Sequence, residues 1–251
     1  MQKISIITST FNSVKTLERT ILSVIAQDHA LVEYIVIDGG STDGTIELIN
    51  SYKQHIHFFI SEKDKGIYDG LNKGIMQATG DVIGFLHSDD HFANDKVISR
   101  ISAAFDKEGD IDAVYGDILF FNMVDGKEKK VRSVKSDVFT PFMFRFGMMP
   151  AHPTFYAKAD VYKKFGLFDL AYKISADFDF LLRVMLLGKI KTKYLPGLMV
   201  KMLAGGTSTK NLKSNLTLNR EILRSCKRHK VYTNYFMIYA KYMYKVFQLG
   251  S

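Results

Sequence analysis

Apolar residues in the first half of the chain alternate between short continuous runs and helical spacing. The runs predict strands at Ile4–Thr8, Tyr34–Asp38, His57–Ser61, Val82–Leu86 and Ala113–Gly116. Between the runs, apolar residues recur every three or four positions and predict helices at 14–25, 46–52, 69–78 and 95–105. Strands separated by helices indicate βαβ units, so we expect an α/β fold with a mostly parallel central sheet flanked by helices.

The pattern changes after Gly116. Asp125-Gly126 is a typical hairpin turn, and it separates the strand-like stretches "DILFFNM" and "KEKKVRSV". Residues 177–187 and about 213–247 have helical spacing, and the second stretch is best interpreted as two helices. We therefore expect a catalytic domain at 1–209, with a donor half at about 1–117 and an acceptor half at about 118–209, followed by a helical tail at 210–251.

Polar residues at the helix starts suggest caps. Asn12 or Ser13 is available to cap the first predicted helix, and Ser41 is expected to cap the second. Asp43 would favour the positive end of the dipole of that second helix.

Charge is unevenly distributed along the 251 residues, whose formal net charge is +8. Of 34 Lys and Arg and 26 Asp and Glu, nine bases and one acid lie between Lys210 and Phe247, so the body carries 25 of each sign. This asymmetry argues against a nucleic-acid-binding body and predicts a tail that meets an anionic partner.

Other compositional features set limits on the class of protein. The single cysteine, Cys226, excludes an intramolecular disulfide and a cysteine-rich zinc module. Met1 leads directly into the first predicted strand, so a signal peptide is not expected. The most apolar stretch, "YFMIYAKYMYKVF", is interrupted by Lys241 and Lys245 and does not approach the roughly 18–20 residues of a membrane span.

Unusual polar groups follow three of the predicted strands. The first strand leads into "TSTFN", the second into "DGGSTDGT" and the fourth into "HSDD". Because ligands bind beyond the carboxyl ends of the strands in open α/β sheets, we expect a site here. Its first members would be Ser9, Phe11, Asp38, Asp89 and Asp90.

The Asp89-Asp90 pair suits a divalent cation. Mg²⁺ or Mn²⁺ prefers oxygen ligands and commonly bridges one or two carboxylates to substrate phosphates. The alternative is a solvated turn, or a cap for the helix that begins near Asp95. At the second strand end, Gly39 and Gly40 would allow a ligand to approach the backbone closely.

Six stretches together resemble family-2 glycosyltransferases, and the resemblance covers about residues 3–205. In chain order they are "SIITSTFN", "YIVIDGGSTDGT", "SEKDKGIYDGLNKGI", "ATGDVIGFLHSDD", "HPTFYAKADVYKKFGLFD" and "ISADFDFLLR". No single stretch is decisive, but their order and spacing are highly specific. The resemblance implies a GT-A (Rossmann-like) fold, and "DKGIYDGLNKGI" is similar to a bacterial branch that builds surface polysaccharides such as O-antigen and exopolysaccharide.

The resemblance also implies a role for each matching position. The nucleotide sugar would be held by Ser9, Phe11, Asp38, Asp64, Gly66, Tyr68, Asn72 and Asp89. Asp90 matches the metal ligand for Mn²⁺ or Mg²⁺, and Asp177 matches the catalytic base of inverting members. His152 lies where acceptor and donor sugar should meet, and Asp179 is a second candidate that would support the loop or contact the acceptor.

Three positions depart from the usual family pattern. Gly39 stands where many members have a second Asp, Phe11 replaces a common Tyr, and His87 stands where Asp or Asn is frequent. The first departure weakens a carboxylate pair at 38–39. His87 is interpreted as a bystander rather than a ligand, and His152 could equally be a packed turn histidine.

The expected function is inverting, metal-dependent transfer of a sugar from a nucleoside-diphosphate sugar, with a UDP-sugar favoured, to an acceptor hydroxyl. The acceptor would be a saccharide, with a lipid-linked one as an option, and a homodimer is a further option. No nucleic-acid partner is expected. The tail is interpreted either as an interfacial segment on an anionic membrane or as packing on the protein, and the expected location is cytoplasmic, with peripheral contact to the inner membrane face.

The sequence leaves three rival functions. A sugar-nucleotide pyrophosphorylase should carry a glycine- and Arg/Lys-rich signature after the first strand, where this chain has "TSTFNSVKTLERT". A non-catalytic binding module would be a degenerate transferase, which donor hydrolysis would exclude. A nucleic-acid-binding protein is suggested by the basic tail, but the chain has no recognisable module and salt-dependent binding would test it.

Overall fold

The structure is a computed structural model that describes residues 1–205 and 212–247, with the side chains of all of these except 212 and 243–247. Its strands are β1 (Ile4–Thr10), β2 (Val32–Asp38), β3 (Phe58–Ser61), β4 (Val82–Phe85), β5 (His91–Phe92), β6 (Ala113–Val124), β7 (Lys127–Val134), β8 (Tyr156–Lys158) and β9 (Thr192–Leu203). Its helices are α1 (Leu17–Ile25), α2 (Thr45–Ser51), α3 (Ile67–Gln77), α4 (Val97–Glu108), α5 (Ala159–Phe165), α6 (Ala176–Leu181), α7 (Leu212–Arg228) and α8 (Tyr235–Phe247). Shorter helical segments are η1 (Lys53–His55), η2 (Pro141–Phe146), η3 (His152–Thr154) and a π-helical stretch (Leu182–Leu187) that continues α6.

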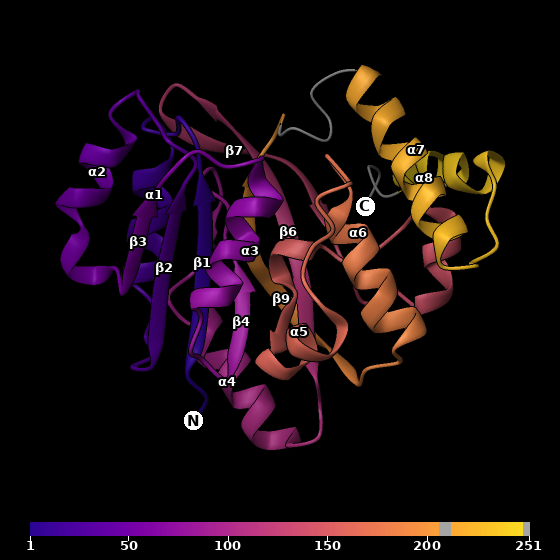
Figure 1. The fold of residues 1–251 in the computed structure, drawn as a ribbon, viewed down its shortest axis with the longest axis horizontal. Coiled ribbons are helices and arrows are strands. Elements are labelled where there is room, and N and C mark those ends of the chain that lie inside the picture. Colours follow the sequence, from indigo (N-terminus) through magenta and orange to yellow (C-terminus); the bar gives the residue numbers. More distant parts are fainter. Residues whose placement is uncertain (206–211, 248–251) are drawn as a thin grey trace.

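One mixed sheet organises the described part of the chain, in the order β3-β2-β1-β4-β8-β6-β9-β5, with β7 paired to β6 (Figure 1). The first four strands are parallel to one another, because β1 pairs with β2 and β4 and β2 pairs with β3 in parallel register. The short strand β8 runs antiparallel to both β4 and β6 and joins this half to the parallel pair β6–β9. The expected α/β sheet flanked by helices is confirmed.

Alternating side chains of the strands feed two hydrophobic clusters, one on each face of the sheet. Ile35 and Ile37 of β2 belong to the cluster that contains α3, α5 and α6, whereas Tyr34 and Val36 belong to the cluster that contains α1, α2 and α4. This period of two is the expected consequence of the β-pleat. Both faces of the central strands are therefore buried, which explains their continuous apolar runs.

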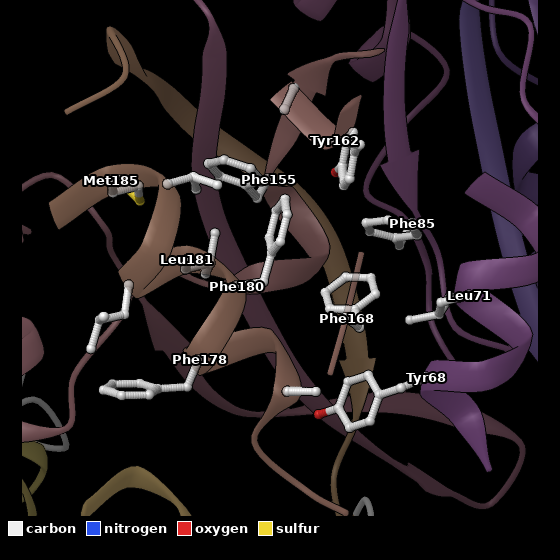
Figure 2. Packing of buried hydrophobic residues seen from close by; sticks show 14 of the residues in the cluster. Tyr68, Leu71, Phe85, Phe155, Tyr162, Phe168, Phe178, Phe180, Leu181 and Met185 are labelled. Carbon is white, nitrogen blue, oxygen red and sulfur yellow. The ribbon is translucent and has the colours of Figure 1, made fainter. Parts of the chain in front are cut away.

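Aromatic side chains tie the two halves of the molecule together, as Figure 2 shows. Tyr68 of α3 contacts Phe168, whose ring in turn packs against Phe180 of α6, with ring centroids 5.6 and 5.2 Å apart. Tyr162 of α5 stacks on Phe180 at 5.0 Å. Helix α3 of the donor half is thereby fixed to the segment that carries Asp177.

The C-terminal helices pack on the elements that precede them. Ile222 and Cys226 of α7 and Ile238 of α8 are buried members of the same cluster as α3 and α6. Lys241 is only 3% exposed and donates to Asn219 Oδ1 at 2.7 Å, so this lysine packs inside the protein. The interpretation of the tail as a packed element is confirmed for the described residues. The proposed domain boundary at 209/210 lies outside the described residues, and the side chain of Lys245 is not described.

Among the described helices, none combines the length and the apolar character that crossing a membrane requires.

The expected helix caps are wrong. Helix α1 begins after Thr16, and Ser13 accepts the N–H groups of Thr16 and Leu17 with its backbone carbonyl rather than with its side chain. Helix α2 begins after Gly44, and Ser41 lies outside it and hydrogen-bonds Asp38 instead. Asp43 does act at this helix start, because its Oδ1 accepts the N–H of Thr45 at 3.0 Å.

Candidate active site

A cavity of about 1020 Å³ opens at the carboxyl ends of β1 and β4, as expected for an α/β sheet. It extends from these strand ends to the wall formed by η2, α6 and α7. The cavity is lined by nine of the residues predicted from sequence: Ser9, Phe11, Asp64, Gly66, Tyr68, Asp89, Asp90, His152 and Asp177. The remaining three, Asp38, Asn72 and Asp179, do not line it.

Asp38 is fully buried, and its carboxylate is committed to neighbouring backbone and side chains. Its Oδ2 accepts the N–H groups of Gly40 and Ser41 at 3.0 and 2.9 Å and the hydroxyl of Ser61 at 2.6 Å. Its Oδ1 accepts the hydroxyl of Ser41 at 2.5 Å. Asp38 therefore shapes the loop after β2 and ties it to the end of β3.

The departure at Gly39 has a structural reason. A Cβ at this position would lie 2.7 Å from Oδ2 of Asp64, so the Asp64 carboxylate would have to shift if residue 39 carried a side chain. Asp64 accepts the N–H of Gly66 at 2.9 Å, and Gly66 has a φ of +113°, which favours glycine. The turn that leads into α3 thus presents Asp64 at the cavity, next to the position where many family members have a second Asp.

Phe11 and Ser9 line the cavity from the end of β1. Phe11 is 60% exposed, so its ring is open to the cavity. Ser9 is buried against α3, where a Cβ at Gly70 would lie 2.3 Å from its hydroxyl oxygen.

The Asp89-Asp90 pair lies in the turn after β4. Asp90 is only 1% exposed. Burial, and then the charge of Asp89, hold the pKa of the Asp90 carboxyl well above its usual range. Its Oδ2 is buried and has no hydrogen-bond partner among the described residues.

A divalent cation fits this arrangement. A cation at Asp90 Oδ2 would satisfy the unpartnered oxygen and stabilise the ionised pair. Within the part of the chain that is described, no cluster of three or more His, Cys, Asp or Glu side chains could hold a metal by itself. Mg²⁺ or Mn²⁺ held by one or two carboxylates and completed by substrate phosphates needs no such cluster.

Asp177 is one of two carboxylates in the first turn of α6 and is 7% exposed. Its Oδ1 accepts the N–H of Phe178 at 2.7 Å and faces the hydroxyl of Tyr68 at 3.2 Å. Burial raises the pKa of the Asp177 carboxyl to about 6. The carboxylate is therefore ionised at neutral pH and more basic than an ordinary aspartate, which suits a general base.

Two histidines extend from Asp177. His152 Nδ1 lies 3.1 Å from Asp177 Oδ2, and His152 Nε2 lies 2.8 Å from His87 Nε2. Burial lowers the pKa of both imidazoles to about 4. The His152–Asp177 contact is therefore a hydrogen bond from a neutral ring rather than an ion pair. His87, interpreted from sequence as a bystander, contacts His152 directly.

Asp179 and Asn72 connect elements beneath the cavity. Asp179 is 1% exposed and accepts from Arg183 Nε at 3.0 Å, Ser225 Oγ at 2.7 Å and His229 Nε2 at 3.0 Å. The support role considered for Asp179 matches this placement, whereas contact with an acceptor does not. The amide of Asn72 exchanges two hydrogen bonds with the backbone of Phe168.

Sequence reasoning missed Glu221, which projects from α7 to the segment just before Asp177. Its carboxylate accepts the N–H groups of Lys173, Ile174 and Ser175 at 2.8, 2.9 and 3.0 Å. Glu221 was visible only as the single acid of the basic tail, and nothing in its spacing pointed to residues nearly fifty positions earlier.

Further groups in the cavity wall were also not predicted. The cations are Lys15, Arg132, Lys135, Lys173 and Lys241. The apolar wall beyond Asp177 consists of Phe139, Met143, Met148, Met149, Phe178, Leu218 and Ile222. Arg132 and Lys135 belong to the hairpin region after Gly126, whose dense alternation of charges gave no sign of which side chains face inward.

Comparisons with known proteins identify relatives of this chain. The family model for glycosyl transferase family 2 matches residues 5–169. An uncharacterized glycosyltransferase of Mycobacterium tuberculosis is 33% identical over 184 residues, which cover 73% of this chain and 69% of the relative. A PGL/p-HBAD biosynthesis glycosyltransferase of Mycobacterium bovis is 26% identical over 76% of this chain and 73% of the relative.

Solved structures show the same fold at low sequence identity. S. aureus TarS 1-349 in complex with UDP-GlcNAc is 18% identical, with a TM-score of 0.63 over 89% of this chain and 66% of that one. The mannosyltransferase PcManGT from Pyrobaculum calidifontis, in complex with GDP-Man and Mn²⁺, is 13% identical, with a TM-score of 0.67 over 93% of this chain and 65% of that one. The longer TarS chain is covered for 39% of its length. With the family model matching most of the chain, this protein belongs to glycosyl transferase family 2 and is a glycosyltransferase with a GT-A fold.

Proposed function

We propose that this protein transfers a sugar from a nucleoside-diphosphate sugar to a hydroxyl group of a saccharide acceptor, with inversion at the anomeric carbon. The observation that carries the proposal is one cavity lined both by the Asp89-Asp90 pair and by the buried, basic carboxylate of Asp177. Assembly of a bacterial surface polysaccharide is the setting implied by the "DKGIYDGLNKGI" segment.

The donor would occupy the end of the cavity near β1 and α3. Phe11 offers an exposed ring on which the nucleobase of the donor could stack. The remaining space is surrounded by Ser9, Asp64, Gly66, Tyr68 and Asp89. Lys15, Arg132 and Lys135 bring positive charge to a cavity that would receive a diphosphate. Asp38 and Asn72 would act one step removed, by holding the loop after β2 and the position of α3. Similar structures bind UDP-GlcNAc and GDP-Man, and a UDP-sugar is our first choice.

Mn²⁺ or Mg²⁺ would bind at Asp90, with Asp89 beside it. When bound, the cation would offset the negative charge that grows on the leaving diphosphate. The unpartnered, buried Oδ2 of Asp90 supports this role, and a similar structure holds Mn²⁺ together with its donor.

Asp177 would act as the general base. The acceptor oxygen forms a bond to the anomeric carbon while the bond from that carbon to the diphosphate breaks. The acceptor hydroxyl gives its proton to Asp177, and the nucleoside diphosphate leaves from the opposite face. General-base assistance of this kind contributes typically ~10²–10⁴-fold to the rate.

The acceptor would enter from the apolar end of the cavity. Four methionine and phenylalanine side chains of the segment 139–149 line it opposite Leu218 and Ile222 of α7. Flexible methionine side chains accommodate apolar groups of varied shape, which supports a lipid-linked saccharide as the acceptor. An anionic membrane surface at the cytoplasmic face is the matching location that we propose.

The experiment that tests the donor assignment is a panel of UDP-, GDP- and dTDP-sugars offered to the purified full-length protein with and without Mn²⁺. We expect one donor class to raise the unfolding temperature and to be hydrolysed only when the cation is present. Asp90→Asn should lose both effects, whereas Asp160→Asn, an exposed carboxylate on α5, serves as the matched control and should behave as the parent. Donor hydrolysis that is equally fast in EDTA would reject the metal role of Asp90.

A further inference from the structure

We propose that His87 is a positioning residue that fixes the tautomer of His152, so that His152 donates its Nδ1–H to the base Asp177. This inference rests on the proposed role of Asp177 and adds a function for two histidines behind it. It is carried by the chain of contacts from His87 through His152 to the Asp177 carboxylate.

The contacts form an unbroken line. His152 Nδ1 lies 3.1 Å from Asp177 Oδ2, and on the other side of the ring His152 Nε2 lies 2.8 Å from His87 Nε2. The two imidazole rings are tilted by 54°, with centroids 5.1 Å apart, so they meet at their nitrogen edges rather than stacking. Both rings line the cavity beside the base.

Proton counting then determines the tautomers. An ionised carboxylate accepts only, so Nδ1 of His152 must carry the hydrogen in its contact with Asp177. A neutral imidazole has one N–H, which leaves Nε2 of His152 as an acceptor. Its partner at 2.8 Å must therefore be a donor, and His87 carries its hydrogen on Nε2.

The surroundings of the fourth ring nitrogen, His87 Nδ1, agree with this assignment. His87 Nδ1 is buried, and among the described residues it has no hydrogen-bond partner. In the assigned tautomer His87 Nδ1 carries a lone pair and no hydrogen. Because no acceptor lies beside Nδ1 in the described part of the chain, nothing favours moving the hydrogen of His87 from Nε2 to Nδ1. Burial keeps the His152 ring neutral, since it disfavours the charged form of an imidazole.

The tautomer of His152 matters because the Asp177 carboxylate has few hydrogen-bond donors around it. Tyr68 has a single hydroxyl hydrogen, and its 2.6 Å contact with the carbonyl of Ile174 is shorter than its 3.2 Å contact with Asp177 Oδ1. Oδ2 faces His152. With the hydrogen on Nε2 instead, the lone pair of His152 Nδ1 would point at Oδ2, and the ionised base would lose a stabilising partner.

Nitrogen-15 NMR of labelled full-length protein at neutral pH tests the assignment without reference to turnover. We expect His152 to carry its hydrogen on Nδ1 and His87 to carry its hydrogen on Nε2. Asp177→Asn places an amide N–H₂ group within reach of His152 Nδ1, which should reverse both tautomers. An Nε2–H tautomer of His152 in the parent would overturn the proposal, and so would unchanged tautomers in an Asp177→Asn variant whose amide nitrogen faces His152.

Two variants of His87 connect the tautomer to the reaction. His87→Gln keeps a donor at the end of a side chain of similar reach, whereas His87→Leu keeps bulk but removes the donor. For the leucine variant we expect kcat of transfer to fall on the order of 10-fold with donor Kd within about 2-fold of the parent. The glutamine variant should stay within about 3-fold of the parent in kcat.

His55→Leu, in the short helix η1 away from the cavity, controls for the loss of a histidine as such. A His87→Leu enzyme that is folded, binds donor and turns over at the parental rate would refute the positioning role. A parent that uses no nucleotide sugar would refute the proposed function, while the tautomers measured in that same protein would still decide this inference.

Discussion

Asp177 and Asp179 lie two residues apart on one helical segment, yet their surroundings give them opposite roles. Asp179 is paired with Arg183 and accepts from Ser225 and His229, so its charge is compensated. Asp177 has no cationic partner within hydrogen-bond distance among the described side chains, and burial raises its pKa to about 6. The helix thus holds one carboxylate for structure and presents the other, with a raised proton affinity, to the cavity.

The first prediction concerns catalysis by Asp177. Asp177→Asn retains size and hydrogen-bonding capacity but cannot accept the hydroxyl proton. We expect transfer to fall on the order of 10²-fold or more, with near-parental binding of the nucleotide sugar measured by calorimetry. Product NMR of the parent should show inverted anomeric configuration. Retained configuration, or near-parental turnover of the variant, would contradict the assignment.

The second prediction concerns the pH dependence of the same carboxylate. Asp177 acts as a base only when ionised, and its pKa is raised to about 6. We therefore expect kcat/KM for the acceptor to fall as the pH drops through about 6, by about tenfold per unit below it. The acid limb should be missing from the residual activity of Asp177→Asn. A limb near pH 4 in the parent would show that another group is the base.

The third prediction is that removing the charge of Asp177 and removing the charge of Asp179 change the free energy of unfolding in opposite directions. The pKa of Asp177 is higher in the folded than in the unfolded chain, so its ionisation lowers the free energy of unfolding above pH 6, and the penalty fades as the pH falls towards 4. Asp177→Asn should thus raise the free energy of unfolding at pH 7.5 by ~1–3 kcal/mol and by less at pH 5. Asp179→Asn should lower it by ~2–3 kcal/mol, because Arg183 loses its charged partner. Denaturant unfolding of both variants at two pH values checks the pair, and stabilisation by both would contradict it.

For single residues, the sequence predicted which side chains line the cavity better than it predicted their burial and their contacts. Short motifs at strand ends pointed to Ser9, Asp89 and Asp90, because the sheet edge brings such segments together. The burial of Asp90 and the contact of His87 with His152 depend on packing between distant segments. No local pattern encodes those contacts.

Between elements, α7 is linked to the catalytic segment through one side chain. Glu221 accepts three consecutive N–H groups of residues 173–175, which lead into α6 and Asp177. These donors are the backbone groups that would otherwise be unsatisfied before the helix. Helix α7 therefore holds the segment that precedes Asp177, although it contributes none of the residues predicted for the site.

The fourth prediction tests this link. Glu221→Gln replaces a carboxylate that accepts from several donors by an amide with one accepting oxygen and an N–H₂ group that faces the same donors. We expect a loss of ~1–3 kcal/mol in the free energy of unfolding and a fall on the order of 10-fold in kcat, with donor affinity retained. Arg220→Gln, the exposed neighbour on the same helix, is the control. If Glu221→Gln is as stable and active as the parent, the segment before Asp177 is held by its other contacts.

Sequence periodicity located the elements of the donor half within a few residues but missed β9. Pro196 and Gly197 fall in the middle of this strand and resemble a turn, yet the strand continues through register shifts opposite Tyr115–Ile118 of β6. The short strands β5 and β8 also escaped notice, since two or three residues carry no period. The Asp-Gly hairpin, by contrast, was predicted from local chemistry alone and is confirmed by the pairing of β6 with β7.

Across the whole molecule, the cavity runs from the polar strand ends of the donor half to an apolar wall shared with the C-terminal helices. Helix α8 shows two faces in this arrangement. Ile238 and Lys241 are buried, whereas Tyr235, Phe236 and Tyr239 are 48%, 86% and 43% exposed. One face holds the helix on the catalytic domain, and the other leaves aromatic side chains uncovered at the surface.

The last prediction tests the two faces of α8 separately. Deleting everything from Asn234 onward would remove both faces at once and could not distinguish their roles. Phe236→Ser removes the most exposed aromatic ring of α8, and we expect it to weaken binding to vesicles that contain anionic lipid several-fold. The unfolding temperature and the hydrolysis of a soluble donor should stay at the parental values. Ile238→Ser, two positions along and fully buried, should instead lower the unfolding temperature, because it leaves a polar group and a cavity in the core. Co-sedimentation with vesicles, measured beside thermal unfolding for both variants, distinguishes the outcomes. Vesicle binding that is unaffected by Phe236→Ser would leave packing as the role of α8 and remove the membrane from the proposed setting.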